Sequence, residues 1–188
     1  HDLLADAAFA LLQIGSTTES GRALDRAVEL IELVERTVTD TDRRALVAAA
    51  SSLAHSMTGH PDTCREQFFA AQRLARSSDV RRRVLPFAYM ALGLPGDLED
   101  RERLATELLG LAAEASDPVA RFEALHLMFS SALQRADGTL ARQAMAEMTG
   151  LIDRTGAVGR RWALLYQAAA LAHLDDRLDE SEASAAAA

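Results

Sequence analysis

Lysine is absent from this sequence: all 20 basic residues are arginines, against 28 acidic residues. Without lysine the chain can form neither a Schiff base nor a Walker-type phosphate loop, whose lysine contacts the β- and γ-phosphates. The net charge of −8 argues against direct binding of nucleic acid, because such domains need basic patches that displace counterions. These absences exclude chemistry that depends on lysine and argue against nucleic acid as a partner.

Cysteine and long apolar segments are also scarce. The single Cys64 excludes a disulfide within the chain and a cysteine-rich metal site, and we interpret it as a small packing residue. No apolar run reaches about 18 residues and no signal peptide is recognisable, so we expect no membrane contact. The sequence therefore predicts a cytoplasmic protein.

Aromatic residues make up only 5% of the chain, while 49% of it is hydrophobic and rich in alanine. Alanine, leucine, arginine and glutamate favour helices, and few of the β-branched residues that strands prefer are present. The composition therefore predicts an all-α fold.

A repeat of about 38 residues organises the helices. Four arginines, Arg44, Arg83, Arg121 and Arg161, recur at spacings of 39, 38 and 40 residues, and each leads an alanine- and leucine-rich stretch. A short turn and a second, more charged helix follow each stretch. The repeat predicts helix hairpins at approximately 1–39, 40–78, 79–116, 117–156 and 157–188, the last one incomplete.

A lone hairpin cannot bury its apolar stripe, but stacked hairpins can. We therefore expect one domain, 1–188, that forms a right-handed α-solenoid of the TPR type, and we expect it to be a fragment of a larger protein. Phe122 and Trp162 follow equivalent arginines, which predicts equivalent environments for the two rings. We expect N-caps or first-turn acids of helices at Asp62, Asp97, Thr139 and Asp179. Gly156 is expected just after the C-terminus of a helix.

The string Asp175-Asp176-Arg177-Leu178-Asp179 matches the D-D-x-x-D pattern with which some all-helical enzymes bind magnesium. It falls where the repeat places a turn, and no second acidic motif accompanies it, so we interpret it as an inter-helix turn. The histidines are spread along the chain without acids at ligand spacing. We therefore predict no catalytic residue, no metal site, no cofactor and no enzymatic activity.

The repeated arginines permit two interpretations. They can cap or pair within the repeat, for example with Asp79 or Asp117, which repetition itself favours. Alternatively, the first helices line a concave groove for a partner. The candidate groove residues are Arg83, Phe87, Arg121, Phe122, Arg161, Trp162 and Tyr166.

Residues 117–188 resemble the TPR-like repeat regions of large bacterial regulators that contain an ATPase core. These include LuxR-type large ATP-binding regulators, AfsR/SARP-type activators and some adenylate cyclases. The likeness lies in Asp117-Pro118, Arg121-Phe122, Ala136-Asp137-Gly138-Thr139-Leu140-Ala141, Arg161-Trp162 and the run from Arg177 to Ala183. Asp176 stands where such proteins commonly have glycine, and nothing in the chain matches their P-loop, helix-turn-helix or cyclase domain.

The resemblance implies a non-catalytic sensor module of a bacterial transcriptional regulator. Its repeats would restrain the ATPase core of the same protein, or receive a partner whose binding changes the curvature of the repeats. The alternative is a free-standing TPR-like adaptor that binds a peptide or protein helix in its groove.

Overall fold

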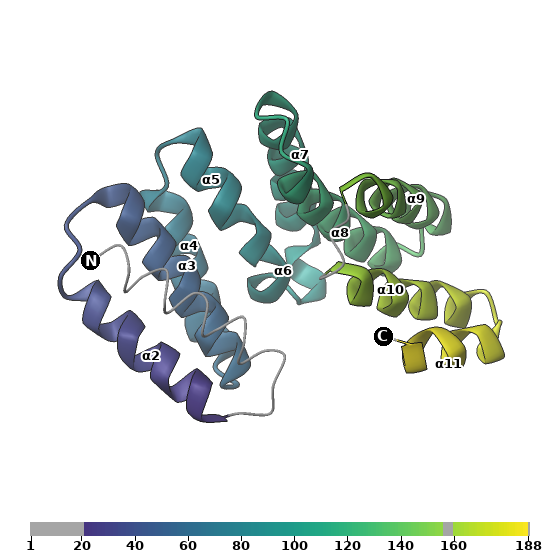
Figure 1. Ribbon diagram of the computed structural model, residues 1–188, viewed down its shortest axis with the longest axis horizontal. Coiled ribbons are helices and arrows are strands. Elements are labelled where there is room, and N and C mark those ends of the chain that lie inside the picture. Colours follow the sequence, from purple (N-terminus) through teal and green to yellow (C-terminus); the bar gives the residue numbers. More distant parts are fainter. Residues whose placement is uncertain (1–20, 156–159, 188) are drawn as a thin grey trace. The chain divides into compact units, whose positions relative to one another are not determined.

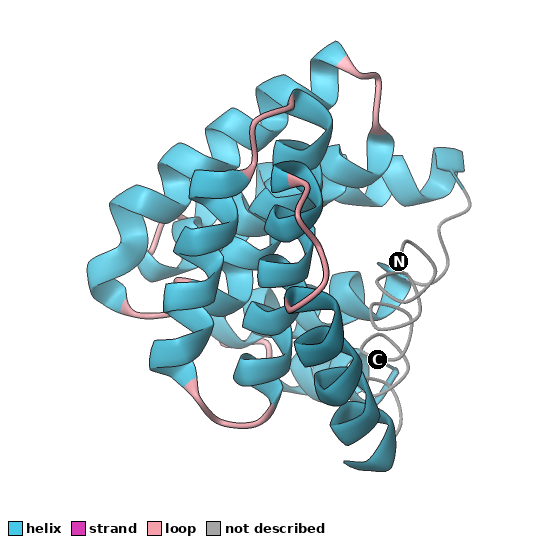
Figure 2. Ribbon diagram, turned by 90° about the vertical axis from the view of Figure 1, so that its left-hand side faces the viewer, coloured by secondary structure: helices cyan, strands magenta, loops and turns pink. Residues whose placement is uncertain are grey.

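The computed structural model describes residues 21–155 and 160–187, and within these ranges it contains helices and no strand (Figures 1 and 2). Neighbouring helices pack in antiparallel pairs, which confirms the all-α, TPR-like fold predicted from the repeat. The chain divides into two compact units, 1–94 and 95–188, and each is described by itself. The predicted hairpin 79–116 spans their boundary, and the single-domain organisation stays a prediction. The helix expected before residue 21 and the cap expected at Gly156 lie outside the described residues.

The first unit is built around one alanine-rich helix, α3 (Thr41–Met57), which pairs with α4 (Pro61–Leu74) (Figure 1). Asp40 begins α3 by accepting a hydrogen bond from the backbone N–H of Arg43, at 2.8 Å. The helix is buried from Val47 to Ser52, because other helices of the unit contact it on several sides. These are α2 (Gly21–Glu35), α5 (Ser78–Val84) and α6 (Ala88–Ala91).

Cys64 lies in the contact between α3 and α4 and is buried, as its interpretation as a packing residue requires. The Ser52 hydroxyl donates a hydrogen bond of 2.9 Å to the Cys64 carbonyl, and the Cys64 Sγ lies 3.3 Å from the same hydroxyl. A buried hydroxyl of α3 is thus satisfied by the facing helix.

The helical stretch that the repeat places after Asp79 is not continuous. It consists of α5, the 3-10 turn η1 (Leu85–Phe87) and α6. Pro86 is the reason, because proline lacks a backbone N–H and its ring clashes with the preceding helical turn. The repeat predicts one uninterrupted first helix for this hairpin, and that prediction was wrong at this position.

Within 95–155 and 160–187, the second unit contains five helices and the short 3-10 turn η2 (Pro95–Asp97). The helices are α7 (Leu98–Glu114), α8 (Pro118–Gln134), α9 (Gly138–Thr155), α10 (Arg161–Leu174) and α11 (Leu178–Ala187). Helix α8 packs against both α7 and α9, and α10 packs against α9 and α11. The buried Arg101 of α7 reaches α8, where its Nε donates to the Ser131 hydroxyl at 3.0 Å.

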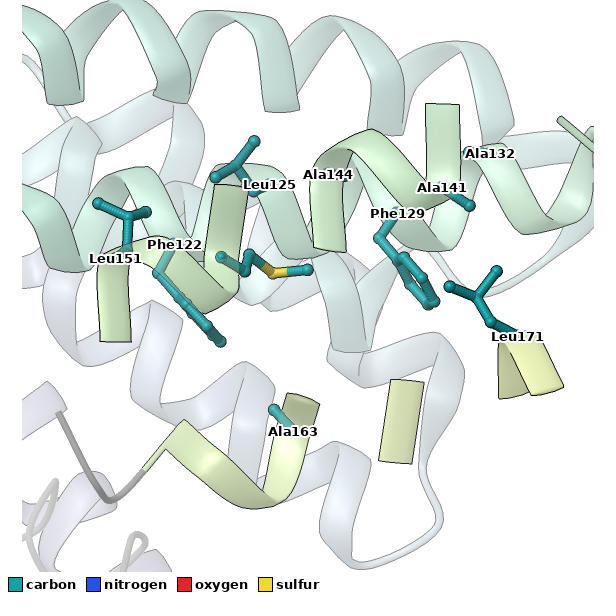
Figure 3. Packing of buried hydrophobic residues seen from close by; sticks show 10 residues of the cluster. Phe122, Leu125, Phe129, Ala132, Ala141, Ala144, Leu151, Ala163 and Leu171 are labelled. Carbon is teal, nitrogen blue, oxygen red and sulfur yellow. The ribbon is translucent and has the colours of Figure 1, made fainter. Parts of the chain in front are cut away.

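Apolar side chains from α8, α9 and α10 form the core of this unit. Phe122, Phe129 and Met148 are each at most 3% exposed. In Figure 3 the Phe129 ring lies beside Leu171, and the Phe122 ring extends toward the helix that carries Ala163. The small Ala163 lets α10 approach the Phe122 ring closely.

The predicted helix-start residues are partly corrected. Asp62 and Asp179 are first-turn acids, as one of the two expected roles requires. Thr139 lies inside the first turn of α9, and the cap is Asp137, whose carboxylate accepts from the Leu140 N–H at 3.0 Å. Asp97 precedes α7 without a side-chain cap hydrogen bond. Helix α8 ends at Gln134, and the short turn after it lets α9 begin directly after Asp137, two residues before the expected cap.

Among the described residues, four with positive φ each follow the end of a helix: Gly59 (78°), Ser116 (52°), Ala136 (56°) and Asp176 (60°). At the third of these, the Asp137 N–H donates to the Ala132 carbonyl at 2.8 Å, and the Ala136 N–H donates to the Leu133 carbonyl at 3.0 Å. This is the Schellman pattern that satisfies the last carbonyls of a helix. Asp176 adopts the same left-handed conformation in place of the expected glycine.

Replacing Ala136 by glycine should stabilise the protein. A left-handed residue with a Cβ costs about 1 kcal/mol that glycine does not, so we expect Ala136→Gly to raise the free energy of unfolding by about 1 kcal/mol. Denaturant unfolding followed by circular dichroism measures the change. The matched control is Ala146→Gly, in the exposed interior of α9, which should lower stability by about the same amount. Equal losses in both variants would contradict the strain at Ala136.

Candidate functional site

The seven residues of the predicted groove belong to both units. Arg83 is exposed on α5 and Phe87 is partly buried in η1, both in the first unit. The other five lie on α8 and α10 of the second unit, where the structure separates them into a buried, a paired and an exposed group. The groove as a whole stays a prediction.

Phe122 lies in the core and not on a surface. It is 3% exposed, and the Arg160 guanidinium lies 5.7 Å from the centre of its ring. Arg160 is held there by an ion pair of 2.9 Å with Glu123. Trp162, its equivalent 40 residues later, is 57% exposed. The expectation of equivalent environments was therefore wrong: α10 covers Phe122, whereas neither α9 nor α11 covers Trp162.

Arg121 and Arg161 also differ in their partners. Arg121 pairs with Glu147 of α9 at 2.8 Å, 26 residues further along the chain, which is the structural role that repetition favoured. The residue 26 positions after Arg161 is Ala187, which offers no charge. Arg161 is exposed and has no ion-pair partner among the described residues. Its guanidinium is available to another molecule.

Trp162 and Tyr166 begin an exposed stripe along α10. They are 57% and 58% exposed, and Leu174, two turns further on, is 61% exposed. The partly buried Ala170 lies between them, so the stripe follows positions i, i+4, i+8 and i+12 of one helix. We call these four residues, together with Arg161, the α10 face. It combines large apolar side chains with a free cation, a composition typical of protein contact surfaces.

The D-D-x-x-D string is a turn between α10 and α11, held by arginines. Asp175 accepts from Arg142 at 2.5 Å and from Arg177 at 3.2 Å. The hydrogen bond from Arg142, reinforced by Arg177, lowers the pKa of the Asp175 carboxyl. Across the residues that the structure describes, no group of three His, Cys, Asp or Glu side chains is arranged to hold a metal ion. The turn interpretation agrees with this geometry.

The ion pair at this turn has a counterpart 40 residues earlier with its charges reversed. Glu102 of α7 accepts from Arg135 at 2.5 and 2.8 Å, whereas Arg142 of α9 donates to Asp175. Both pairs join residues 33 positions apart and sit at the end of a first helix. The same two positions thus form an ion pair in both repeats, but the acid and the arginine exchange places.

Three of the histidines have surroundings that their spacing did not predict. His126 is partly buried on α8, with its ring centre 6.4 Å from that of Phe122, and burial lowers its pKa to about 4. The rings of His55 and His60 meet edge to face, with their centres 6.0 Å apart. Glu35 interacts electrostatically with His55, but among the described residues the histidines belong to no group of three side chains that could hold a metal ion.

A groove of about 380 Å³ lies between α9, α10 and α11. Its walls include Arg142, Ala168 and Glu180. Forty residues earlier, the positions equivalent to Ala168 and Glu180 hold Met128 and Leu140, which pack against the core. Ala168 is smaller than Met128, and the charged Glu180 replaces the apolar Leu140, so the space between these helices stays open. The 40-residue spacing of Arg121 and Arg161 already made this comparison possible from the sequence.

Comparison with known proteins supports the fold. No protein-family model matches the chain, and no curated protein matches it. A solved structure of pilF from Pseudomonas aeruginosa, a TPR-containing protein, is similar with a TM-score of 0.50 and 16% sequence identity. The similarity covers 96% of this chain and 90% of pilF. At this identity the likeness concerns the arrangement of helices alone.

Within 21–155 and 160–187, no helix is both long enough and apolar enough to cross a bilayer.

Proposed function

We propose that this chain is a non-catalytic protein-interaction module, the regulatory repeat region of a bacterial multidomain transcriptional regulator in the cytoplasm. The observation that carries the proposal is the α10 face, where Trp162 and Tyr166 are more than half exposed beside the unpaired Arg161. Aromatic and arginine side chains supply most of the binding energy at protein interfaces.

The TPR-like arrangement supports the same role. Stacked helix pairs present extended surfaces on which several repeats contact one partner. The likeness of residues 117–188 to the repeat regions of ATPase-containing regulators favours the ATPase core of the same protein as that partner. In this role the module would stabilise one of two states of the core, by as much as its affinities for them differ.

Capture of partners from a native extract tests the role of the α10 face. The chain 1–188 should retain a defined set of proteins, and Trp162→Ala with Tyr166→Ala should lose it. Val119→Ala is the matched control, because Val119 is 46% exposed in the same unit but lies on α8. Retention of the same proteins by all variants would contradict the proposal.

A second experiment separates the regulator from the alternative, a free-standing adaptor for a peptide or protein helix. A parent protein that contains an ATPase core should lose its response to an inducer when residues 117–188 are deleted. A normal response after the deletion would exclude the regulatory role and favour the adaptor.

A further inference from the structure

We propose that the α10 face binds a second copy of this chain, through an antiparallel α10–α10 contact about a two-fold axis. This inference rests on the proposed role of the α10 face in protein contacts, and it adds a second copy of the chain to the ATPase core as a partner of that face. It depends on how charges are placed at the two ends of α10, and on what lies between them.

The free charges at the ends of α10 oppose its helix dipole. Arg161 lies in the first turn, where the dipole favours anions, and Asp176 follows the last turn, where it favours cations. Neither side chain has a partner among the described residues, unlike Asp175 and Arg160, which form ion pairs within the unit. The stability of the isolated helix therefore does not explain this placement.

An antiparallel copy of α10 satisfies both ends at once. In such a pair the N-terminus of each helix lies beside the C-terminus of the other, so Arg161 faces Asp176 of the second copy, and the reverse contact repeats it. A two-fold axis requires this self-complementarity. The helix dipoles of the pair also oppose each other favourably.

The stripe between the charged ends fits the same arrangement. Trp162 and Leu174 are exposed near opposite ends of α10. In the antiparallel pair, Trp162 of each copy lies beside Leu174 of the other copy. Ala170 lies between Tyr166 and Leu174, where a small side chain permits two helices to approach to about 8–10 Å. The contact extends over about 20 Å, the length of a 14-residue helix.

Other occupants fit less well. A uniformly acidic helix would pair with Arg161 but would place its charges beside Asp176, and a basic helix would have the opposite conflict. The helix that suits both ends has a cation at its start and an anion at its end, as α10 itself does. The small area of one helix face predicts a weak, reversible dimer.

The association can be measured by sedimentation equilibrium on residues 1–188 over a concentration series. Trp162 is the only tryptophan in the chain, so its emission should shift to shorter wavelength as the dimer forms. Trp162→Ala should give a monomer, while Val119→Ala should dimerise like the unaltered chain. A monomer at every concentration would overturn the inference.

Charge reversal provides the sharper test. Arg161→Asp and Asp176→Arg should each weaken self-association about tenfold, because each creates two like-charge contacts in the dimer. Mixing the two variants in equal amounts should restore association, because in the mixed dimer both contacts join opposite charges. A mixture that stays as weak as its components would exclude this geometry.

Asp176 lies in a left-handed turn, so circular dichroism must first show that Asp176→Arg is folded. If it is not, Asp176→Asn removes the charge with a side chain that tolerates this conformation, and it should weaken the dimer by a smaller factor. A variant without this effect would count against the contact. If the chain is monomeric while Trp162→Ala still abolishes capture of another protein, the inference fails and the proposed function stands.

Discussion

Acidification should destabilise this protein by about 3 kcal/mol through His126 alone, between pH 6.5 and about 4. Burial lowers the pKa of His126 in the folded chain, whereas in the unfolded chain its pKa is close to 6.5. In this interval the unfolded state binds more protons, so the free energy of unfolding falls as the pH falls. Above pH 6.5 the histidine is neutral in both states and stability is unaffected by it. Below about pH 4 it is charged in both, and its effect is complete.

Urea unfolding at a series of pH values, followed by the emission of Trp162 in the same unit, measures this loss. His126→Gln removes the titrating group. Between pH 6.5 and about 4, this variant should therefore lose about 3 kcal/mol less of its free energy of unfolding than the unaltered chain loses. His173→Gln is the matched control, because His173 is exposed on α10. An unchanged pH profile in His126→Gln would mean that the ring is hydrated in the folded state. Carboxylates with lowered pKa values, such as Glu102 and Asp175, lose their ion pairs at lower pH in every variant alike.

Gln167→Met should raise the free energy of unfolding by about 1–3 kcal/mol. Gln167 is 1% exposed, and neither its amide nitrogen nor its amide oxygen has a hydrogen-bond partner. It lies one turn from Ala163 and one turn from Leu171, both of which belong to the apolar core. Methionine has nearly the same length and flexibility and needs no hydrogen bond, so the cost of dehydrating the amide disappears while the packing remains.

The matched control is Gln143→Met, because Gln143 is exposed on α9 and its amide is hydrated in both states. We expect no change in stability there. A loss of stability in Gln167→Met would show that the buried amide has a partner, such as an enclosed water, and that the substitution orphans it. Gln167→Ala distinguishes packing from polarity, since it removes the amide but also leaves a cavity.

Both predictions concern side chains whose burial the repeat did not predict. A repeat in the sequence tells which residues share a helix face, but burial depends on what the neighbouring helix brings. Phe122 is covered because α10 brings Ala163 and Arg160 to it, while Trp162 at the equivalent position is open. Gln167 falls on the core side of α10 between two apolar residues, although its chemistry suggested a surface position.

The local errors have local causes. Pro86 interrupted a helix that composition alone favoured, because a single missing N–H outweighs the propensities of its neighbours. The cap of α9 is Asp137 and not Thr139, since the turn before it, with Ala136 in a left-handed conformation, determines where the helix can begin. Asp176 adopts that conformation as well, so the turn depends on its position in the repeat more than on glycine.

The sequence by itself determined that this chain folds as paired antiparallel helices, because alanine- and leucine-rich stretches recur with turns between them. It also excluded chemistry that depends on lysine. Only the tertiary structure decided which of two equivalent residues is buried, which arginine finds an acid, and which face of a helix is left open. The reason is that helix formation is governed by local propensity and period, whereas burial and pairing are properties of neighbours distant in sequence. Arg121 and Arg161 illustrate the difference: the repeat made them alike, and Glu147 and Ala187 made them different.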